Sequence, residues 1–218
     1  MGIVCGSSLR SREQGNESTK ESGIRNLGLA IVVVGGSAKD VGKTALVCGV
    51  IAALPEFGWT AVKISGHDYE PDGSEGSRPD TSNQTIWEET RAGQETDTGR
   101  YLAAGARRAL LVTRVEPHVP IDEIKSAIGE DRNVIFESNR IVDAVKPDVV
   151  LALAGNPSEG MKASFERLLR VADAVVSLDA DARVEGAPVG TPRFELDDAD
   201  RLPPEMVKWL RKRLKVPN

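Results

Sequence analysis

Cysteine and histidine are scarce in this sequence, with two of each among 218 residues. So few of these ligands can build neither a disulfide scaffold nor a metal store of the Cys/His-rich kind. Cys48 falls in an apolar segment and is expected in the core, whereas Cys5 lies in a polar one. This cysteine usage is typical of a reducing compartment and predicts a cytoplasmic protein.

Long apolar runs and an excess of positive charge are also lacking. No stretch approaches the roughly 18 apolar residues of a membrane span, and the first residues contain no apolar signal-peptide core. The net charge is −5, so we expect neither membrane insertion nor nucleic-acid binding through bulk positive charge. The basic residues near the C-terminus are interpreted as a solvated helix face favoured by the helix dipole: Lys208, Arg211, Lys212, Arg213 and Lys215.

Residues 1–26 are polar and have no periodic apolar pattern, which predicts a disordered leader. Residues 27–218 are predicted to form a single domain, because strand-like and helix-like segments alternate along them. That alternation predicts a mostly parallel sheet with helices on both faces. Strands are expected at residues 29–34, 60–65, 109–115, 133–136, 149–154 and 174–178, and helices at 43–54, 120–128, 161–171 and 204–214.

A long polar segment, residues 66–96, interrupts this alternation. Connections of that length in a compact domain are usually functional, and a plain insertion is the alternative. The segment leaves the end of the second predicted strand, where open α/β sheets place their ligands. A short helix is predicted near residues 85–90.

A glycine-rich motif, GSAKDVGKT at residues 36–44, follows the first predicted strand. The common P-loop pattern is GxxxxGK[S/T]; here Ser37 stands in place of its first glycine, and five residues separate Gly36 from Gly42. A buried strand before the loop and a helix after it provide the context that the motif requires. Together they predict the three-layer α/β fold of P-loop NTPases. A turn that merely caps a helix is the alternative.

The P-loop residues have separable predicted roles. Backbone N–H groups of the loop, helped by the helix dipole, would hold phosphate oxygens. Lys43 would bridge the β- and γ-phosphates as a catalytic cation, and the Thr44 hydroxyl would bind Mg²⁺. Lys39 could reach a phosphate, although such a lysine is more often solvated. The ligand is expected to be GTP or ATP with Mg²⁺, bound by Gly36, Lys39, Asp40, Val41, Gly42, Lys43, Thr44 and Ala45.

Carboxylates at strand ends are the candidate metal ligands. Glu137 follows three apolar residues of a predicted strand and is expected to hold Mg²⁺ directly or through water. A solvent-facing acid is the alternative. His67 and Asp68 follow the second strand, and Asp68 is predicted to contact the metal or to order the attacking group. Asp97 and Arg100 begin a further helix, where an N-terminal cap is the simplest role for Asp97.

The order of these motifs resembles the molybdopterin-guanine dinucleotide biosynthesis protein B (MobB) group, which belongs to the SIMIBI class of P-loop NTPases. The resemblance rests on residues 62–68, on the segment DTGRYLAAGA at 97–106, and on Phe136-Glu137 at the end of a strand. It implies a GTP-binding accessory protein that assists attachment of a nucleotide to molybdopterin. It also implies a homodimer and a second cofactor or small-molecule substrate.

The chain departs from the MobB pattern at three points. His67 alone remains of a histidine cluster, Ser138 and Asn139 replace a glycine, and the loop before Asp97 is longer.

The P-loop is also similar to that of dethiobiotin synthetase, which has the same spacing and the same VGKT ending. Lys63 would then correspond to that family's lysine after the second strand, although its Glu-Gly-Ala-Gly-Gly segment has no counterpart here. An ATP-dependent ligase is therefore a second hypothesis, and a non-catalytic, nucleotide-responsive adaptor is a third. The sequence leaves the base of the nucleotide open. Asp179 or Asp181 could accept a hydrogen bond from guanine, and adenine is the alternative.

Overall fold

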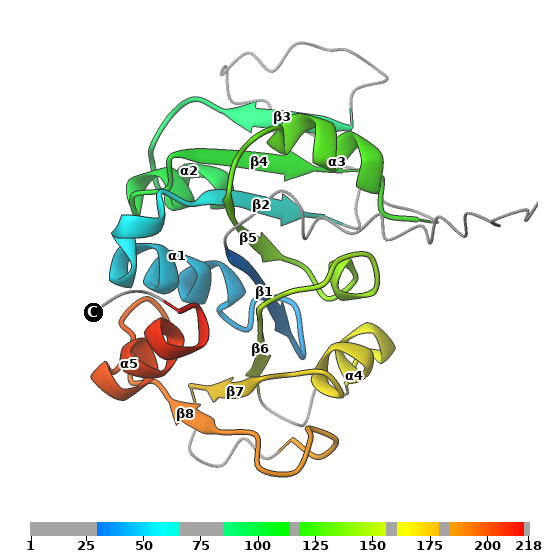
Figure 1. Ribbon diagram of the computed structural model, residues 1–218, viewed down its shortest axis with the longest axis vertical. Helices are drawn as coiled ribbons and strands as arrows, with labels where there is room; N and C mark the ends of the chain where they lie inside the picture. The colour runs from blue at the N-terminus through cyan, green and yellow to red at the C-terminus, as the bar shows by residue number, and fades with distance from the viewer. Residues whose placement is uncertain (1–29, 66–84, 114–117, 156–160, 179–183, 216–218) are drawn as a thin grey trace, which may run out of the picture.

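The computed structural model of this chain describes residues 30–65, 85–113, 118–155, 161–178 and 184–215 (Figure 1). The predicted leader lies outside these residues, as do Cys5, His67, Asp68, Asp179 and Asp181. What was expected of them stays a prediction. No helix in the described ranges is long and apolar enough to cross a bilayer.

Eight strands in the described ranges form one sheet in the order β3-β4-β2-β5-β1-β6-β7-β8. Every neighbouring pair is parallel except β3 and β4. The strand that precedes the glycine-rich loop, β1, therefore lies in the middle of the sheet. The strands are β1 (Ala30–Gly36), β2 (Thr60–Ile64), β3 (Ile86–Glu89), β4 (Arg108–Val112), β5 (Asn133–Glu137), β6 (Val149–Ala154), β7 (Ala174–Ser177) and β8 (Arg193–Glu195).

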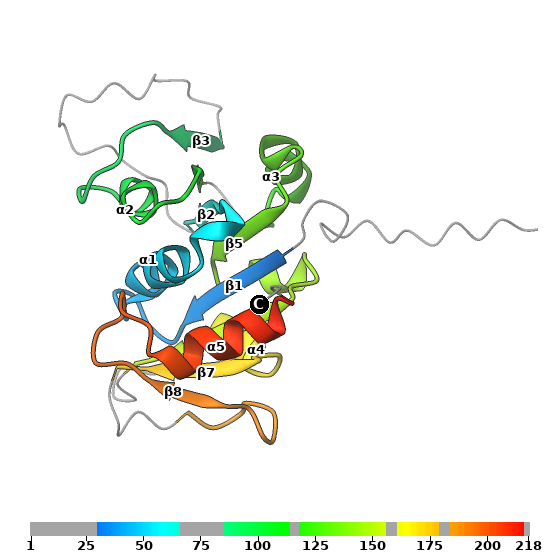
Figure 2. The ribbon, with the colours of Figure 1, turned by 60° about the vertical axis from the view of Figure 1, so that its left-hand side comes forward.

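Helices cover both faces of this sheet (Figures 1 and 2). One face packs against α1 (Lys43–Ala53), α2 (Asp97–Ala103) and α5 (Pro204–Arg213), and the other against α3 (Ile121–Ile128) and α4 (Ala163–Leu169). Two short 3-10 helices complete the described elements, η2 (Pro55–Phe57) and η3 (Ile141–Asp143). The three-layer α/β fold that the sequence predicts is thus confirmed.

The alternation along β1 shows why its sequence is continuously apolar. Ile31 and Val33 join the core beneath α3 and α4, while Val32 and Val34 join the core beneath α1, α2 and α5. Both sets are almost fully buried. A strand covered on both faces needs apolar residues at every position, which is the pattern that the sequence displays.

Two edge strands differ from the sequence prediction. Residues 86–89 form β3, which pairs antiparallel with β4, where a short helix was predicted. Residues 193–195 form β8, which was not predicted at all. Both are short and only partly buried, so neither has the apolar pattern that marks a strand in the sequence. Their pairing partners, β4 and β7, decide the conformation instead.

The basic residues near the C-terminus lie on α5 and just beyond it. Arg211 pairs with Glu56 at 2.8 Å, and Arg213 pairs with Asp173. Lys208, Lys212 and Lys215 are exposed and form no ion pair with any described residue, so the expected solvated face holds for the three lysines and not for the two arginines. The helix buries Met206 and Leu210 on its other side.

A buried carboxylate joins three elements where β2, β4 and β5 begin. Asp131 Oδ2 accepts hydrogen bonds from Thr60 Oγ1 at 2.7 Å and from Arg108 Nη1 at 2.7 Å, and Oδ1 accepts one from Arg107. Burial opposes the charge of this carboxyl, but the three donors outweigh burial and lower the pKa of Asp131 below its ordinary 3.8. This network is structural, because it lies at the opposite edge of the sheet from the P-loop.

We expect Asp131→Asn to lower the free energy of unfolding near pH 7 by about 1–3 kcal/mol, because charged hydrogen bonds are replaced by weaker ones. A depressed pKa stabilises the folded state above the unfolded-state pKa. The difference between the two proteins should therefore be complete above about pH 4 and shrink as the pH falls further. Urea unfolding of both proteins across this range measures it. Asp122→Asn is the control, since the Asp122 side chain is 92% exposed. A difference that does not vary with pH would contradict the prediction.

Candidate nucleotide and magnesium site

The loop between β1 and α1 folds back closely on the end of β1. Gly42 has φ 100° and Asp40 has φ 57°, so both adopt the left-handed conformation. A Cβ atom at Gly36 would lie 2.6 Å from Val41 Cγ1 and 2.8 Å from Lys43 Cγ. Only glycine fits at position 36 while the loop keeps this course, which explains why the longer motif begins there.

Two polar side chains that the common P-loop pattern does not specify, Asn139 and Ser37, hold the start of the loop. Asn139 Nδ2 donates to the Gly36 carbonyl at 2.9 Å, and Asn139 Oδ1 accepts from the Gly36 N–H at 2.8 Å. Ser37 Oγ accepts from the Gly155 N–H at 2.8 Å. Ser37, which replaces a glycine of the common pattern, therefore ties the loop to the residue after β6. The sequence analysis gave neither side chain this role; the only available signal was their position directly at strand ends.

The backbone N–H groups of loop residues 38–45 have no hydrogen-bond acceptor among the described residues. Gly42 precedes α1 without a side-chain cap, so the positive end of the helix dipole is not neutralised there. Lys43 Nζ donates to the Ala38 carbonyl at 2.7 Å, and burial lowers the pKa of Lys43. Lys39 and Asp40 are exposed. The backbone N–H groups of the loop and the Lys43 ammonium are donors that suit a polyphosphate.

Glu137 is the centre of a buried polar cluster. The residue is 2% exposed. Its Oε2 accepts from Thr44 Oγ1 at 2.8 Å and from the Tyr101 hydroxyl, and its Oε1 accepts from Lys63 Nζ at 2.5 Å. Glu137 therefore does not face solvent, and its carboxylate points at the threonine of the P-loop.

The sheet register explains this gathering. Val34, Glu137 and Lys63 are neighbours across β1, β5 and β2, so their side chains share one face of the sheet. The helices α1 and α2 pack on that same face. Thr44 is in the first turn of α1, and Tyr101 is on α2. Three separate elements, β2, α1 and α2, thus converge on the carboxylate at the end of β5.

Asp97 belongs to this cluster and does not cap α2. Its Oδ2 lies 2.6 Å from Lys63 Nζ. Thr96 is the N-cap residue, because its backbone is extended and its hydroxyl accepts from the Gly99 N–H at 2.9 Å. The capping role suggested for Asp97 is therefore wrong: its neighbour takes that role and leaves the Asp97 carboxylate available to the site.

Glu89, the last residue of β3, fixes the start of α2. Its Oε2 accepts from Thr96 Oγ1 at 3.1 Å and from Thr98 Oγ1 at 3.2 Å. Its Oε1 accepts from the next two backbone N–H groups at 3.0 and 3.1 Å. These hydrogen bonds outweigh burial and lower the pKa of Glu89. The unpredicted strand β3 consequently helps to hold Asp97 in place.

The charges of the cluster reinforce one another. Burial opposes the charge of Lys63, but Glu137 and Asp97 outweigh burial and raise the pKa of Lys63. Burial likewise opposes the charge of Asp97, yet Lys63 lowers the pKa of Asp97. Burial, with the neighbouring Glu137, raises the pKa of Tyr101 well above 10. Tyr101 therefore remains a hydrogen-bond donor throughout the physiological range.

The oxygen atoms around Lys63 are chemically suited to Mg²⁺. Thr44 offers a hydroxyl, and Glu137 and Asp97 offer carboxylates, which are the hard ligands that this ion prefers. The described ranges contain no group of three or more His, Cys, Asp or Glu side chains that could hold a metal. Phosphate and water oxygens would therefore complete the coordination, as is usual for Mg²⁺. Asp68, predicted as a further ligand, lies outside the described residues.

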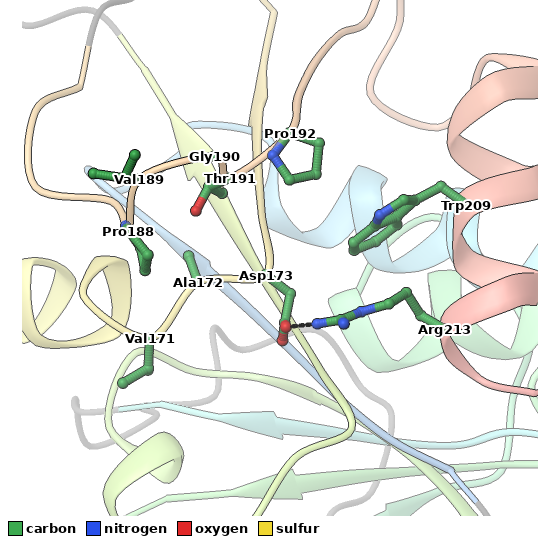
Figure 3. A pocket seen from close by; sticks show the side chains of 10 residues that line it. All are labelled: Val171, Ala172, Asp173, Pro188, Val189, Gly190, Thr191, Pro192, Trp209 and Arg213. Atoms are coloured by element: carbon green, nitrogen blue, oxygen red, sulfur yellow. Dashed lines mark ion pairs between the residues drawn. The ribbon is translucent and has the colours of Figure 1, made fainter.

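A separate cavity of about 360 Å³ lies where β7 and β8 begin (Figure 3). Val171 and Val189, both well exposed, line it together with Trp209. Arg213 lies 5.7 Å from the centre of the Trp209 ring and pairs with Asp173. Because the strands are parallel, this cavity and the P-loop are at opposite edges of the sheet. It is not part of the nucleotide site.

No protein-family model and no curated protein matches this chain. Solved structures that it resembles include the MobB protein of Bacillus subtilis, at 16% identity and a TM-score of 0.48, over 85% of this chain and 99% of that one. The MobB homolog of Bacillus stearothermophilus has 20% identity and a TM-score of 0.44, over 86% and 99%. LpxK of Aquifex aeolicus, solved in complex with ATP, has 16% identity and a TM-score of 0.43, over 75% of this chain and 52% of that one. MobB proteins, the group that the motif order resembles, are among these structures.

Proposed function

We propose that this chain binds a nucleoside triphosphate together with Mg²⁺ and cleaves its terminal phosphoryl group. One observation supports this most directly: the Thr44 hydroxyl of the P-loop lies 2.8 Å from the buried Glu137 carboxylate. A hydroxyl and a carboxylate so placed, beside backbone N–H groups and the Lys43 ammonium, form the arrangement that P-loop phosphoryl transfer needs.

In this proposal each residue has a distinct task. The backbone of residues 38–45 and the Lys43 ammonium hold the phosphates. Thr44, Glu137 and Asp97 hold Mg²⁺, which would neutralise charge on the phosphate oxygens. Asp68, which follows β2 in the sequence, is proposed to order the attacking group. The chemistry is then positioning and electrostatic stabilisation rather than covalent catalysis.

We propose GTP as the nucleotide and an accessory role like that of MobB in molybdenum cofactor guanylylation. The support is the order of motifs, in which residues 97–106 are the most specific part after the P-loop. Two side chains of this segment contact the candidate site: Asp97 pairs with Lys63, and the Tyr101 hydroxyl donates a hydrogen bond to Glu137. The homodimer and the second, cofactor-like substrate rest on the same resemblance.

An ATP-dependent ligase is the second candidate, and the position of Lys63 favours it. Its ammonium lies between Glu137 and Asp97, beside the P-loop threonine. A cation there could also hold a second substrate that receives the phosphoryl group. Nucleotide preference separates the two candidates.

Calorimetric titration with GTP and with ATP, each with Mg²⁺, tests the proposal. We expect GTP to bind at least about tenfold more tightly than ATP, a difference of about 1.4 kcal/mol. The reverse order would favour the ligase. Phosphate release is then measured at saturating nucleotide, and tight binding without release would indicate a nucleotide-responsive adaptor. A protein that binds neither nucleotide would overturn the proposed function.

A further inference from the structure

The Lys63 ammonium lies among the oxygen atoms of the candidate Mg²⁺ ligands. We propose that the Lys63 ammonium is a resident cation of this site: it neutralises Glu137 and Asp97 while no nucleotide is bound, and gives way to Mg²⁺ when the nucleotide arrives. The inference rests on the proposed function only for its second half, the arrival of Mg²⁺ with a nucleotide.

The contacts of Lys63 support this role. Its Nζ lies 2.5 Å from Glu137 Oε1, 2.6 Å from Asp97 Oδ2 and 3.5 Å from Thr44 Oγ1. These are the three residues whose oxygen atoms suit Mg²⁺, and they are all the polar partners that the described residues offer this ammonium. An ordinary surface lysine would pair with whichever acid is near. Among the described residues, the Lys63 ammonium instead contacts the three candidate metal ligands Thr44, Glu137 and Asp97 and no other polar group.

Burial explains why a cation is needed there. The Glu137 residue is 2% exposed and the Lys63 side chain 19% exposed, so water screens their charges poorly. A buried carboxylate without a counter-ion is strongly destabilising, which means that the nucleotide-free protein requires a positive charge at this point. Lys63 supplies it from the neighbouring strand, because residue 63 is directly opposite residue 137 in the β2–β5 register.

The ammonium and Mg²⁺ would exclude each other. Mg²⁺ binds oxygen at about 2.1 Å, so an ion held by the same oxygen atoms would lie within about 5 Å of the present Nζ position, and two cations so close repel strongly. A lysine has a flexible stem and can move its charge to a new anion. The phosphates of a bound nucleotide are such an anion. Nucleotide therefore brings the metal and also a new partner for Lys63, whereas Mg²⁺ alone brings no partner.

The test needs no nucleotide. Thermal unfolding is followed in EDTA and then with Mg²⁺ as the chloride salt. In EDTA we expect Lys63→Met to lower the melting temperature by about 10 °C, because Glu137 loses its counter-ion. Mg²⁺ alone should restore several degrees to this variant and change the wild-type protein by no more than about 1 °C. Lys125→Met is the matched control, since the Lys125 side chain is 22% exposed and pairs with an acid elsewhere; it should show no response to Mg²⁺.

The double variant Lys63→Met/Glu137→Gln keeps the test decisive if Lys63→Met does not fold. It removes the cation together with the buried charge that requires it. Its melting temperature in EDTA should therefore be close to that of the wild-type protein and should not change when Mg²⁺ is added. A double variant no more stable than Lys63→Met would overturn the proposal. So would a Lys63→Met protein as stable as wild type in EDTA, or equal stabilisation of both by Mg²⁺. None of these results depends on nucleotide, so failure here and failure to bind GTP or ATP are separate outcomes.

Discussion

Replacing Lys43 with alanine is expected to weaken triphosphate binding about a hundredfold or more and to leave the protein folded. The ammonium would make charge-assisted hydrogen bonds to two phosphates, each contributing about 1.5–3 kcal/mol. The fold loses little, because the partner described for this ammonium is a carbonyl of its own loop, Ala38. Glu137 keeps its ion pair with Lys63, so removal of Lys43 leaves no buried acid unpaired. Calorimetry gives the affinity, and thermal unfolding confirms that the variant is folded.

Lys39→Ala is the matched control, because Lys39 lies in the same loop and is exposed. We expect it to weaken binding only a few-fold, as the loss of a solvated charge should. A folded Lys43→Ala protein with wild-type affinity would refute the phosphate-binding role of the loop. Equal losses in both variants would show that the charge of the loop matters and the position of Lys43 does not.

Replacing Glu137 with glutamine is expected to slow phosphate release about a hundredfold in a single turnover, with a much smaller change in nucleotide affinity. Glutamine keeps the size of the side chain, and its carbonyl can still accept from Thr44 and Tyr101. Lys63 keeps its ion pair with Asp97. The charge that complements the metal is lost, and such electrostatic stabilisation acts mainly in the transition state. Rapid-quench measurements at saturating Mg²⁺ and nucleotide give the rate.

Tyr101→Phe is the control for Glu137→Gln. It removes one hydrogen bond to the same carboxylate without changing its charge, so release should slow only a few-fold. A Glu137→Gln protein as fast as wild type would restrict Glu137 to a structural role. Asp68 would then be the stronger candidate for the metal.

The sequence by itself determined the fold class and the identity of the phosphate loop. Local patterns carry this information: a six-residue apolar run at 29–34, the spacing of Gly36 and Gly42 before Lys43 and Thr44, and helical periodicity in α4 and α5. Glu137 was also found in this way, because a carboxylate directly after an apolar run predicts the end of a buried strand. Each of these features depends only on residues close together in the chain.

Only the tertiary structure decided how the site is assembled around Glu137. Lys63 and Glu137 are 74 positions apart, and the parallel register of β2 and β5 brings them together. Asp97 was interpreted as a cap because sequence alone does not show whether it or Thr96 is the N-cap residue. Segments such as β3 are too short and polar to be recognised until a partner strand pairs with them. Contacts of this kind arise from packing between distant segments, which no local pattern reports.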